Sequence, residues 1–359
     1  MAPRFHDLKV AAIARETPEA VAVAFEIPDA LRETFAFRPG QYLTLATDID
    51  GKEARRSYSI CSAPGEPTLR VGVKRVADGR FSSFVNERLS VGDTIRVMPP
   101  EGRFTSLAGE RHDYVLIAAG SGITPMLSIA KTVLSHEPDS TITLIYGNRS
   151  TDTIMFREEL EDLKDRHMRR FSVVHLLSRE AQDVELFNGR IDGARITELA
   201  NRGLIDVAAA DGIFLCGPGE MIDEVSTALK ALGVEGDRIR FERFTPSGDA
   251  PAPRSRSARA QKAAEAGVEI EVVLDGVRRA FPMAETDATV LDAAHRAGLE
   301  IPYSCAGGMC CTCRCRVAEG EAEMAVNYSL QPWEIEAGFT LACQTRPTSK
   351  RLVLDFDAS

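Results

Sequence analysis

The sequence has no long apolar stretch, and its 359 residues include only one tryptophan and six histidines. Its apolar runs fall well short of the roughly 20 residues that a membrane-spanning helix requires. The histidines show no metal-ligand spacing, and the Glu-x-x-His motif of carboxylate di-iron sites is missing, which argues against an oxygen-activating centre in this chain. A net charge of −10 disfavours nucleic acid as a partner. We expect no membrane and no nucleic-acid partner.

The eight cysteines are the most informative feature that is present. Cys305, Cys310 and Cys313 have the C-x4-C-x2-C spacing of a plant-type [2Fe–2S] site, and Cys343 offers a fourth thiolate. Gly307 and Gly308 keep side chains out of the intervening loop, so that its backbone can wrap around a cluster. A cluster of this kind carries one electron at a time, so the cysteine pattern predicts single-electron transfer.

A structural zinc site is the alternative for these cysteines, although zinc sites usually use paired C-x2-C motifs. Cys311 and Cys315 fall outside the ligand spacing, and we expect them to be small, partly or fully buried residues. Cysteines used as ligands rather than as disulfides indicate a reducing compartment. With an N-terminus that lacks the apolar core of a signal peptide, this predicts a cytoplasmic protein.

The pattern of strands and turns predicts three domains and a linker. Residues 1–107 consist of short strands separated by turn signals and favour an antiparallel β-barrel. Residues 108–244 alternate apolar runs with helical segments, as in a parallel α/β sheet. Residues 245–266 are rich in Pro, Ala, Ser and Arg and read as a linker, helical from Ala258 to Ala266. Residues 267–359 give a hairpin, a helix capped by Thr286 or Asp287, the cysteine loop and a late strand, the order of a β-grasp ferredoxin domain.

A glycine-rich turn follows the apolar run Tyr114–Ala119 and predicts a dinucleotide-binding loop. Gly120 and Gly122 would let the backbone approach a pyrophosphate, with Thr124 as helix N-cap and Pro125 at the first helical position. Such a glycine pair also occurs in ordinary tight turns, so the motif is weak by itself.

Two later strand ends support a nucleotide site. Arg149 and Ser150 stand where an acidic residue would hold the ribose of NAD, and a cation with a hydroxyl favours the 2′-phosphate of NADPH over NADH. Arg149 could equally be a solvated surface residue. Cys216 and Gly217 end another strand where a cofactor could be met, with a buried small residue as the alternative for Cys216.

Two segments of the predicted barrel suit a phosphate and a flat heterocycle. The run Arg56-Ser57-Tyr58-Ser59 joins a guanidinium, an aromatic face and hydroxyls. The segment from Gly79 through Phe81 to Ser82 could donate backbone N–H groups to phosphates. Each could also be a surface hairpin.

Taken together, these motifs resemble the ferredoxin–NADP reductase superfamily, in the subgroup with a C-terminal ferredoxin domain. Arg56-Ser57-Tyr58-Ser59 is similar to its R-x-Y-S flavin motif and Gly79–Ser82 to its G-x-x-S phosphate loop. Gly120–Pro125 is similar to its G-x-G-x-x-P nucleotide loop, and Cys216-Gly217-Pro218 to its C-G-P strand end. The resemblance covers nearly the whole chain.

The resemblance implies FAD in the barrel, NAD(P)H in the α/β domain and a [2Fe–2S] cluster on Cys305, Cys310, Cys313 and Cys343. It implies that Arg56 holds phosphate, that Tyr58 stacks on the isoalloxazine, and that Ser59, Cys216 and Glu242 shape the hydride-transfer site. Phe244 matches an aromatic residue that often covers the flavin, but here a linker follows it instead of the chain end.

Further stretches resemble the reductases of the phenylacetyl-CoA epoxidase family, among them Phe37-Arg38-Pro39-Gly40-Gln41 and Asn327-Tyr328-Ser329-Leu330. This implies an NAD(P)H:acceptor oxidoreductase that supplies electrons to a multi-subunit di-iron epoxidase in phenylacetate catabolism. Reductases of ketosteroid hydroxylases share the layout and remain an alternative. A non-catalytic carrier module stapled by zinc is an alternative from another class.

Overall fold

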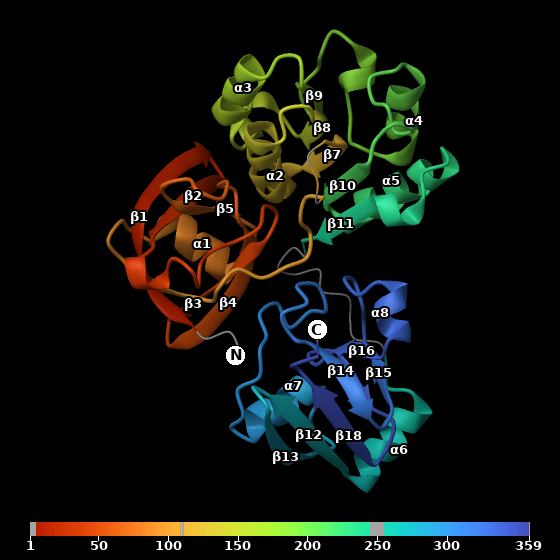
Figure 1. Cartoon of the computed structure of the whole chain (residues 1–359). Helices are drawn as coiled ribbons and strands as arrows, with labels where there is room; N and C mark the ends of the chain where they lie inside the picture. The colour runs from red at the N-terminus through yellow and green to blue at the C-terminus, as the bar shows by residue number, and fades with distance from the viewer. Residues whose placement is uncertain (1–4, 108, 110, 245–254, 359) are drawn as a thin grey trace. The chain divides into compact units, whose positions relative to one another are not determined.

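The computed structural model describes residues 5–107, 109, 111–244 and 255–358 (Figure 1). The chain divides into two compact units: one combines the barrel with the α/β domain, and the other contains the C-terminal domain. The predicted linker falls partly on residues 245–254, which lie outside the described residues. Its second half is helix α6 (Ala258–Ala266), as predicted, and Ala263 of this helix joins the C-terminal core.

The barrel is a six-stranded antiparallel sheet in the order β4-β3-β6-β1-β2-β5. Its strands are β1 (His6–Thr17), β2 (Ala20–Glu26), β3 (Tyr42–Ile49), β4 (Lys52–Ser59), β5 (Leu69–Lys74) and β6 (Thr94–Val97). Directly after β4, Ile60 pairs with Val71 of β5, which brings the two outer strands together and closes the sheet. Helix α1 (Arg80–Glu87) follows β5 and buries Phe81 and Val85 in the barrel core.

The α/β domain has a parallel sheet in the order β11-β10-β7-β8-β9. Its strands are β7 (Asp113–Ala119), β8 (Thr141–Asn148), β9 (Phe171–Leu177), β10 (Gly212–Gly217) and β11 (Ile239–Arg243). Its helices are α2 (Ile123–His136), α3 (Arg157–Arg166), α4 (Gly193–Asn201) and α5 (Gly219–Ala231). Because side chains alternate along a strand, Leu116 of β7 packs with α2 and α3, whereas Ile117 packs with α4 and α5.

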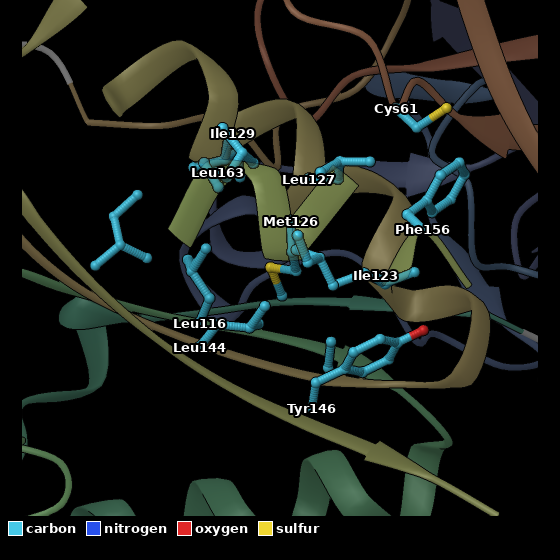
Figure 2. Packing of buried hydrophobic residues seen from close by; sticks show 14 of the residues in the cluster. Cys61, Leu116, Ile123, Met126, Leu127, Ile129, Leu144, Tyr146, Phe156 and Leu163 are labelled. Carbon is cyan, nitrogen blue, oxygen red and sulfur yellow. The ribbon is translucent and has the colours of Figure 1, made fainter. Parts of the chain in front are cut away.

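Barrel and α/β domain share one hydrophobic cluster, shown in Figure 2, in which Cys61 of the barrel accompanies Phe156 and the α2 side chains. Charged residues join the same two domains. The two terminal guanidinium nitrogens of Arg70, Nη1 and Nη2, donate to the carboxylate of Glu159, at 2.8 and 2.9 Å. Lys131 of α2 lies 2.5 Å from Glu159 and 3.0 Å from Glu66. These partly buried pairs and the shared core fix the barrel against the α/β domain.

The C-terminal domain is a five-stranded mixed sheet in the order β13-β12-β18-β14-β16. Its strands are β12 (Val268–Leu274), β13 (Val277–Met283), β14 (Arg314–Glu319), β16 (Phe339–Leu341) and β18 (Arg351–Asp355), and β15 (Ala322–Met324) pairs with β17 (Thr345–Pro347). Helix α7 (Val290–Arg296) packs on the sheet, and α8 (Pro332–Glu336) precedes β16. The predicted caps of α7 are wrong: Thr289 caps the helix, while Asp287 accepts hydrogen bonds from Arg296.

The predicted fold classes are confirmed for all three domains. In the part of the chain that the structure describes, no helix is long and apolar enough to cross a bilayer.

Candidate functional site

The three residues expected at the hydride-transfer site come together from two domains. Cys216 of β10 and Glu242 of β11 are direct partners in the parallel ladder, so the strand register alone sets them side by side. Ser59 ends barrel strand β4, and its hydroxyl donates a 2.8 Å hydrogen bond to the Glu242 carboxylate. Ser59 and Cys216 are buried.

Burial governs the protonation of this group. It raises the pKa of Glu242 to about 7, against the opposing effect of the hydrogen bond from Ser59. Burial, together with the nearby Glu242 carboxylate, also raises the pKa of the Cys216 thiol well above its usual range. Near neutral pH the site therefore holds a neutral thiol and a carboxyl group that can keep or release its proton.

The side chains of the predicted flavin motif on β4 differ in their exposure to solvent. Tyr58 is half-buried, and its ring lies 5.8 Å from the Phe81 ring, at an interplanar angle of 37°. Arg56 is exposed and donates to the carbonyl oxygen of Arg55 at 2.7 Å, and Ser57 is half-buried. Phe81 itself is fully buried, so it supports Tyr58 from behind and offers no side-chain surface to a ligand.

The segment predicted as a phosphate loop is the start of α1, with Gly79 as its N-cap. The Ser82 hydroxyl accepts from the Val76 N–H at 3.1 Å and donates to the Gly79 carbonyl at 3.1 Å. The Ser82 hydroxyl thus uses its hydrogen bonds within the turn. A phosphate could instead be bound by the N–H groups of the first helical turn, which have no partner within the helix.

The predicted nucleotide loop is the 3-10 turn η2 (Gly120–Gly122) at the end of β7. Gly120 has φ +55°, and a side chain on it would meet only the Lys74 ammonium, at 3.8 Å, so its surface is open to a ligand. At Gly122 a Cβ would lie 2.1 Å from the Cys216 carbonyl oxygen, so this glycine is required for packing against β10.

The roles predicted for Thr124 and Pro125 are wrong in detail. Helix α2 begins at Ile123 with Gly122 as N-cap, because the 3-10 turn leads directly into the helix. Thr124 lies inside the first turn, is buried, and donates to the Ser121 carbonyl at 3.0 Å. Pro125 is also buried. Both side chains are packed into the loop and the first turn of α2.

The remaining predicted nucleotide and flavin residues lie at or just after the ends of strands β8, β10 and β11 and differ in exposure. Arg149 is exposed, and its Nη1 lies 3.7 Å from a carboxylate oxygen of Glu19. The Ser150 hydroxyl donates to Asp152, and Ser150 caps the short turn η3 (Thr151–Thr153). Gly217 ends β10, where a Cβ would be 2.7 Å from Met221. Phe244 is half-buried against the cluster shared by barrel and α/β domain.

Sequence reasoning missed Lys74 as a candidate nucleotide contact. It ends barrel strand β5, and its ammonium lies beside Gly120 of the nucleotide loop. Burial and the charge of Arg149 lower the pKa of Lys74, whereas Glu19 opposes this shift. A lysine that directly follows the apolar run Val71-Gly72-Val73 was the available signal, but its distance in sequence from Gly120 concealed the contact.

In the C-terminal domain the loop before β14 holds the predicted cluster ligands. The Cys305 sulfur accepts N–H groups from Gly307, Met309 and Cys310 at 3.3 to 3.4 Å. Interaction with the Cys310 thiol and these N–H donors lowers the pKa of Cys305 to about 5, as a thiolate ligand requires. Gly308 has φ +76° and lies against Val326 and Gln344, whereas a Cβ on Gly307 would meet only the Cys305 carbonyl oxygen, at 3.6 Å.

The four predicted ligands form two pairs. The Cys310 thiol interacts with Cys305, and the Cys343 thiol interacts with Cys313. Among the described residues, no three His, Cys, Asp or Glu side chains converge as ligands of a single ion. The charge of Cys310 also acts on Cys313, so the two pairs are neighbours. Two neighbouring thiolate pairs are what the two irons of a [2Fe–2S] cluster require. Cys311 donates to Ser329 instead, and Cys315 is buried next to Thr340, as expected for non-ligands.

Three family models match the chain in the order of its domains. They are an oxidoreductase FAD-binding domain over residues 7–106, an oxidoreductase NAD-binding domain over residues 116–227 and a 2Fe-2S iron-sulfur cluster binding domain over residues 272–348. FAD, a pyridine nucleotide and a [2Fe–2S] cluster are therefore the cofactors of this chain.

Curated relatives match over nearly their full length. The chain is 44% identical to one of the subunits of 1,2-phenylacetyl-CoA epoxidase from Escherichia coli, over 99% of this chain and 98% of that protein. It is 36% identical to the ferredoxin reductase component of 3-ketosteroid-9-alpha-monooxygenase from Rhodococcus rhodochrous, over 97% of this chain and 96% of that protein. The solved structure of phthalate dioxygenase reductase shares the fold, with a TM-score of 0.60 at 23% identity and 98% coverage of both chains.

The order of domains, the paired cysteines and these full-length relatives agree with one another. The chain belongs to the ferredoxin–NADP reductase superfamily, in the group of flavin and iron–sulfur reductase components that supply electrons to oxygenases.

Proposed function

We propose that this chain is the reductase component of a multi-subunit di-iron epoxidase that acts on phenylacetyl-CoA in phenylacetate catabolism. The observation that carries this proposal is the 44% identity to a phenylacetyl-CoA epoxidase polypeptide over 98% of its length. The ketosteroid monooxygenase reductase, which represents the alternative partner class, is 36% identical over a similar span. Four cysteines with the spacing of cluster ligands favour the reducing cytoplasm as its location.

When bound, FAD accepts a hydride from the nicotinamide and releases single electrons, which the [2Fe–2S] cluster carries onward. Tyr58 offers the half-buried ring on which the isoalloxazine would stack, supported by Phe81. Arg56 and the first N–H groups of α1 would hold the FAD phosphates. Ser59 and Glu242 hold a hydrogen-bonded proton at the site where the flavin and nicotinamide would meet, and Cys216 stays a neutral thiol beside them.

For the nucleotide, Gly120 offers open backbone and Lys74 a cation beside it, which suits a pyrophosphate. Arg149 would contact the 2′-phosphate of NADPH, and this side chain is the reason for preferring NADPH over NADH. In the C-terminal domain Cys305 and Cys310 would bind one iron, and Cys313 and Cys343 the other.

Reconstituted turnover tests the proposed partner. The purified chain, NADPH and phenylacetyl-CoA are combined with the epoxidase oxygenase components, and epoxide formation is measured. A parallel reaction uses a ketosteroid monooxygenase with its steroid substrate. We expect turnover with the epoxidase at least tenfold above that with the monooxygenase. Equal or reversed rates would contradict the assignment, while leaving the reductase chemistry intact.

A further inference from the structure

Three charged side chains meet where the barrel faces the nucleotide loop. Arg149, just after β8, lies 3.7 Å from the Glu19 carboxylate. Lys74, at the end of β5, has its ammonium beside Gly120. Glu19 belongs to the turn between β1 and β2, and Ala20 next to it pairs with Lys74 across the sheet. Two cations and one carboxylate thus surround the place where a dinucleotide would lie.

The Glu19 backbone is fixed by the barrel. Its N–H donates to the Thr17 hydroxyl at 3.2 Å, and its carbonyl accepts the Arg75 N–H at 2.7 Å. The carboxylate can therefore move only through its own side-chain rotations. The backbone hydrogen bonds thus hold Glu19 beside Arg149.

The contact between Glu19 and Arg149 is weak enough for a ligand to open. The two side chains are 39% and 52% exposed, and 3.7 Å is near the limit for an ion pair. Exposed pairs of this kind contribute little to stability. An incoming phosphate can take the guanidinium from Glu19, but it then lies beside a second negative charge.

We propose that Glu19 is a specificity-determining residue that limits the preference for NADPH by competing with the 2′-phosphate for Arg149. This inference rests on the Arg149 contact of the proposed function. NADH carries only a hydroxyl at that position, and this hydroxyl can donate a hydrogen bond to a carboxylate. Glu19 thus penalises the phosphorylated nucleotide and leaves NADH usable.

Steady-state kinetics of Glu19→Gln test the proposal, with ferricyanide as acceptor so that no oxygenase is needed. The ratio of kcat/KM for NADPH to that for NADH should rise about 3- to 10-fold, because the carboxylate that competes with the 2′-phosphate for the Arg149 guanidinium is removed. The change should lie in KM for NADPH and leave kcat alone. The effect should disappear when Arg149→Ala is already present, since the competition needs the guanidinium.

Glu26→Gln is the matched control, because it removes the same charge at the opposite, exposed end of β2 and should leave the ratio within about twofold. A lower kcat/KM for NADPH in Glu19→Gln would overturn the proposal and show that Glu19 positions Arg149. An equal rise with and without Arg149 would overturn it as well. Failure of epoxidase turnover would reject the proposed partner without affecting this ratio.

Discussion

At the scale of single residues, Glu242 links protonation to folding. Its pKa rises from 4.5 to about 7 because burial disfavours the carboxylate. The folded chain therefore keeps a proton that the unfolded chain loses between pH 4.5 and 7. Linkage makes the folded state less stable as pH rises through this interval, so the buried carboxylate costs stability near neutral pH.

Replacement by glutamine should remove this dependence. Glu242→Gln keeps an oxygen that accepts from Ser59 but cannot ionise. The variant should gain about 1–3 kcal/mol over the parent between pH 5 and pH 8, a shift of several degrees in Tm. Thermal unfolding of both chains at the two pH values measures the difference. A constant difference across this range would show that Glu242 is not held in its neutral form.

At the scale of elements, the crossing of β5 with α2 depends on one glycine. A Cβ on Gly72 would lie 2.6 Å from the Thr124 methyl and 3.1 Å from the Phe156 ring. Phe156 has φ +56°, and its N–H donates to Glu16 of the barrel at 3.0 Å, so neither neighbour can move away easily. The barrel strand and the nucleotide helix can approach this closely only without a side chain at this position.

Gly72→Ala should therefore loosen the joint between barrel and α/β domain. Forcing a methyl group into this contact should cost about 1–3 kcal/mol, and Tm should fall by several degrees. Gly236→Ala is a suitable comparison, because its nearest neighbour, Lys230, would be 3.9 Å from the new Cβ. Similar melting of both variants would show that the crossing tolerates a larger separation.

Elements whose position follows from local sequence could be predicted, and the contacts between them could not. The run Tyr114–Ala119 and the cysteine spacing revealed a strand and a cluster loop because their signals lie within a few residues. Thr124 was misjudged as a cap because a 3-10 turn precedes α2. Lys74 and Glu19 were missed because only the packing of the barrel brings them to Gly120 and Arg149.

At the scale of the whole molecule, Tyr58, Cys216 and Glu242 belong to one compact unit. The four predicted cluster ligands belong to the other, with which Arg55–Ser57 are grouped. Each unit has its own hydrophobic core. Loss of the cluster should therefore leave the reaction between nucleotide and flavin intact.

Cys343→Ser should abolish electron transfer to a one-electron protein acceptor such as cytochrome c, because serine is a poor ligand for iron at this site. Flavin reduction by NADPH is measured in a stopped-flow instrument as the loss of flavin absorbance. It should keep at least about half its rate, because it does not need the cluster. Cys311→Ser is the control, since a serine can keep the hydrogen bond to Ser329, and its cytochrome c reduction should resemble the parent. Equal loss of both activities in Cys343→Ser would contradict separate modules.

The pairing of Cys216 with Glu242 has a consequence for how this protein can vary. A slip of β11 by one position would place Arg243 opposite the thiol and aim a guanidinium at Ser59 in place of an acid. An insertion or deletion in the turn Gly236–Arg238 is therefore harmless only if the ladder keeps its alignment. The length of this turn sets the register of β11 against β10, so insertions and deletions should be tolerated better in other loops.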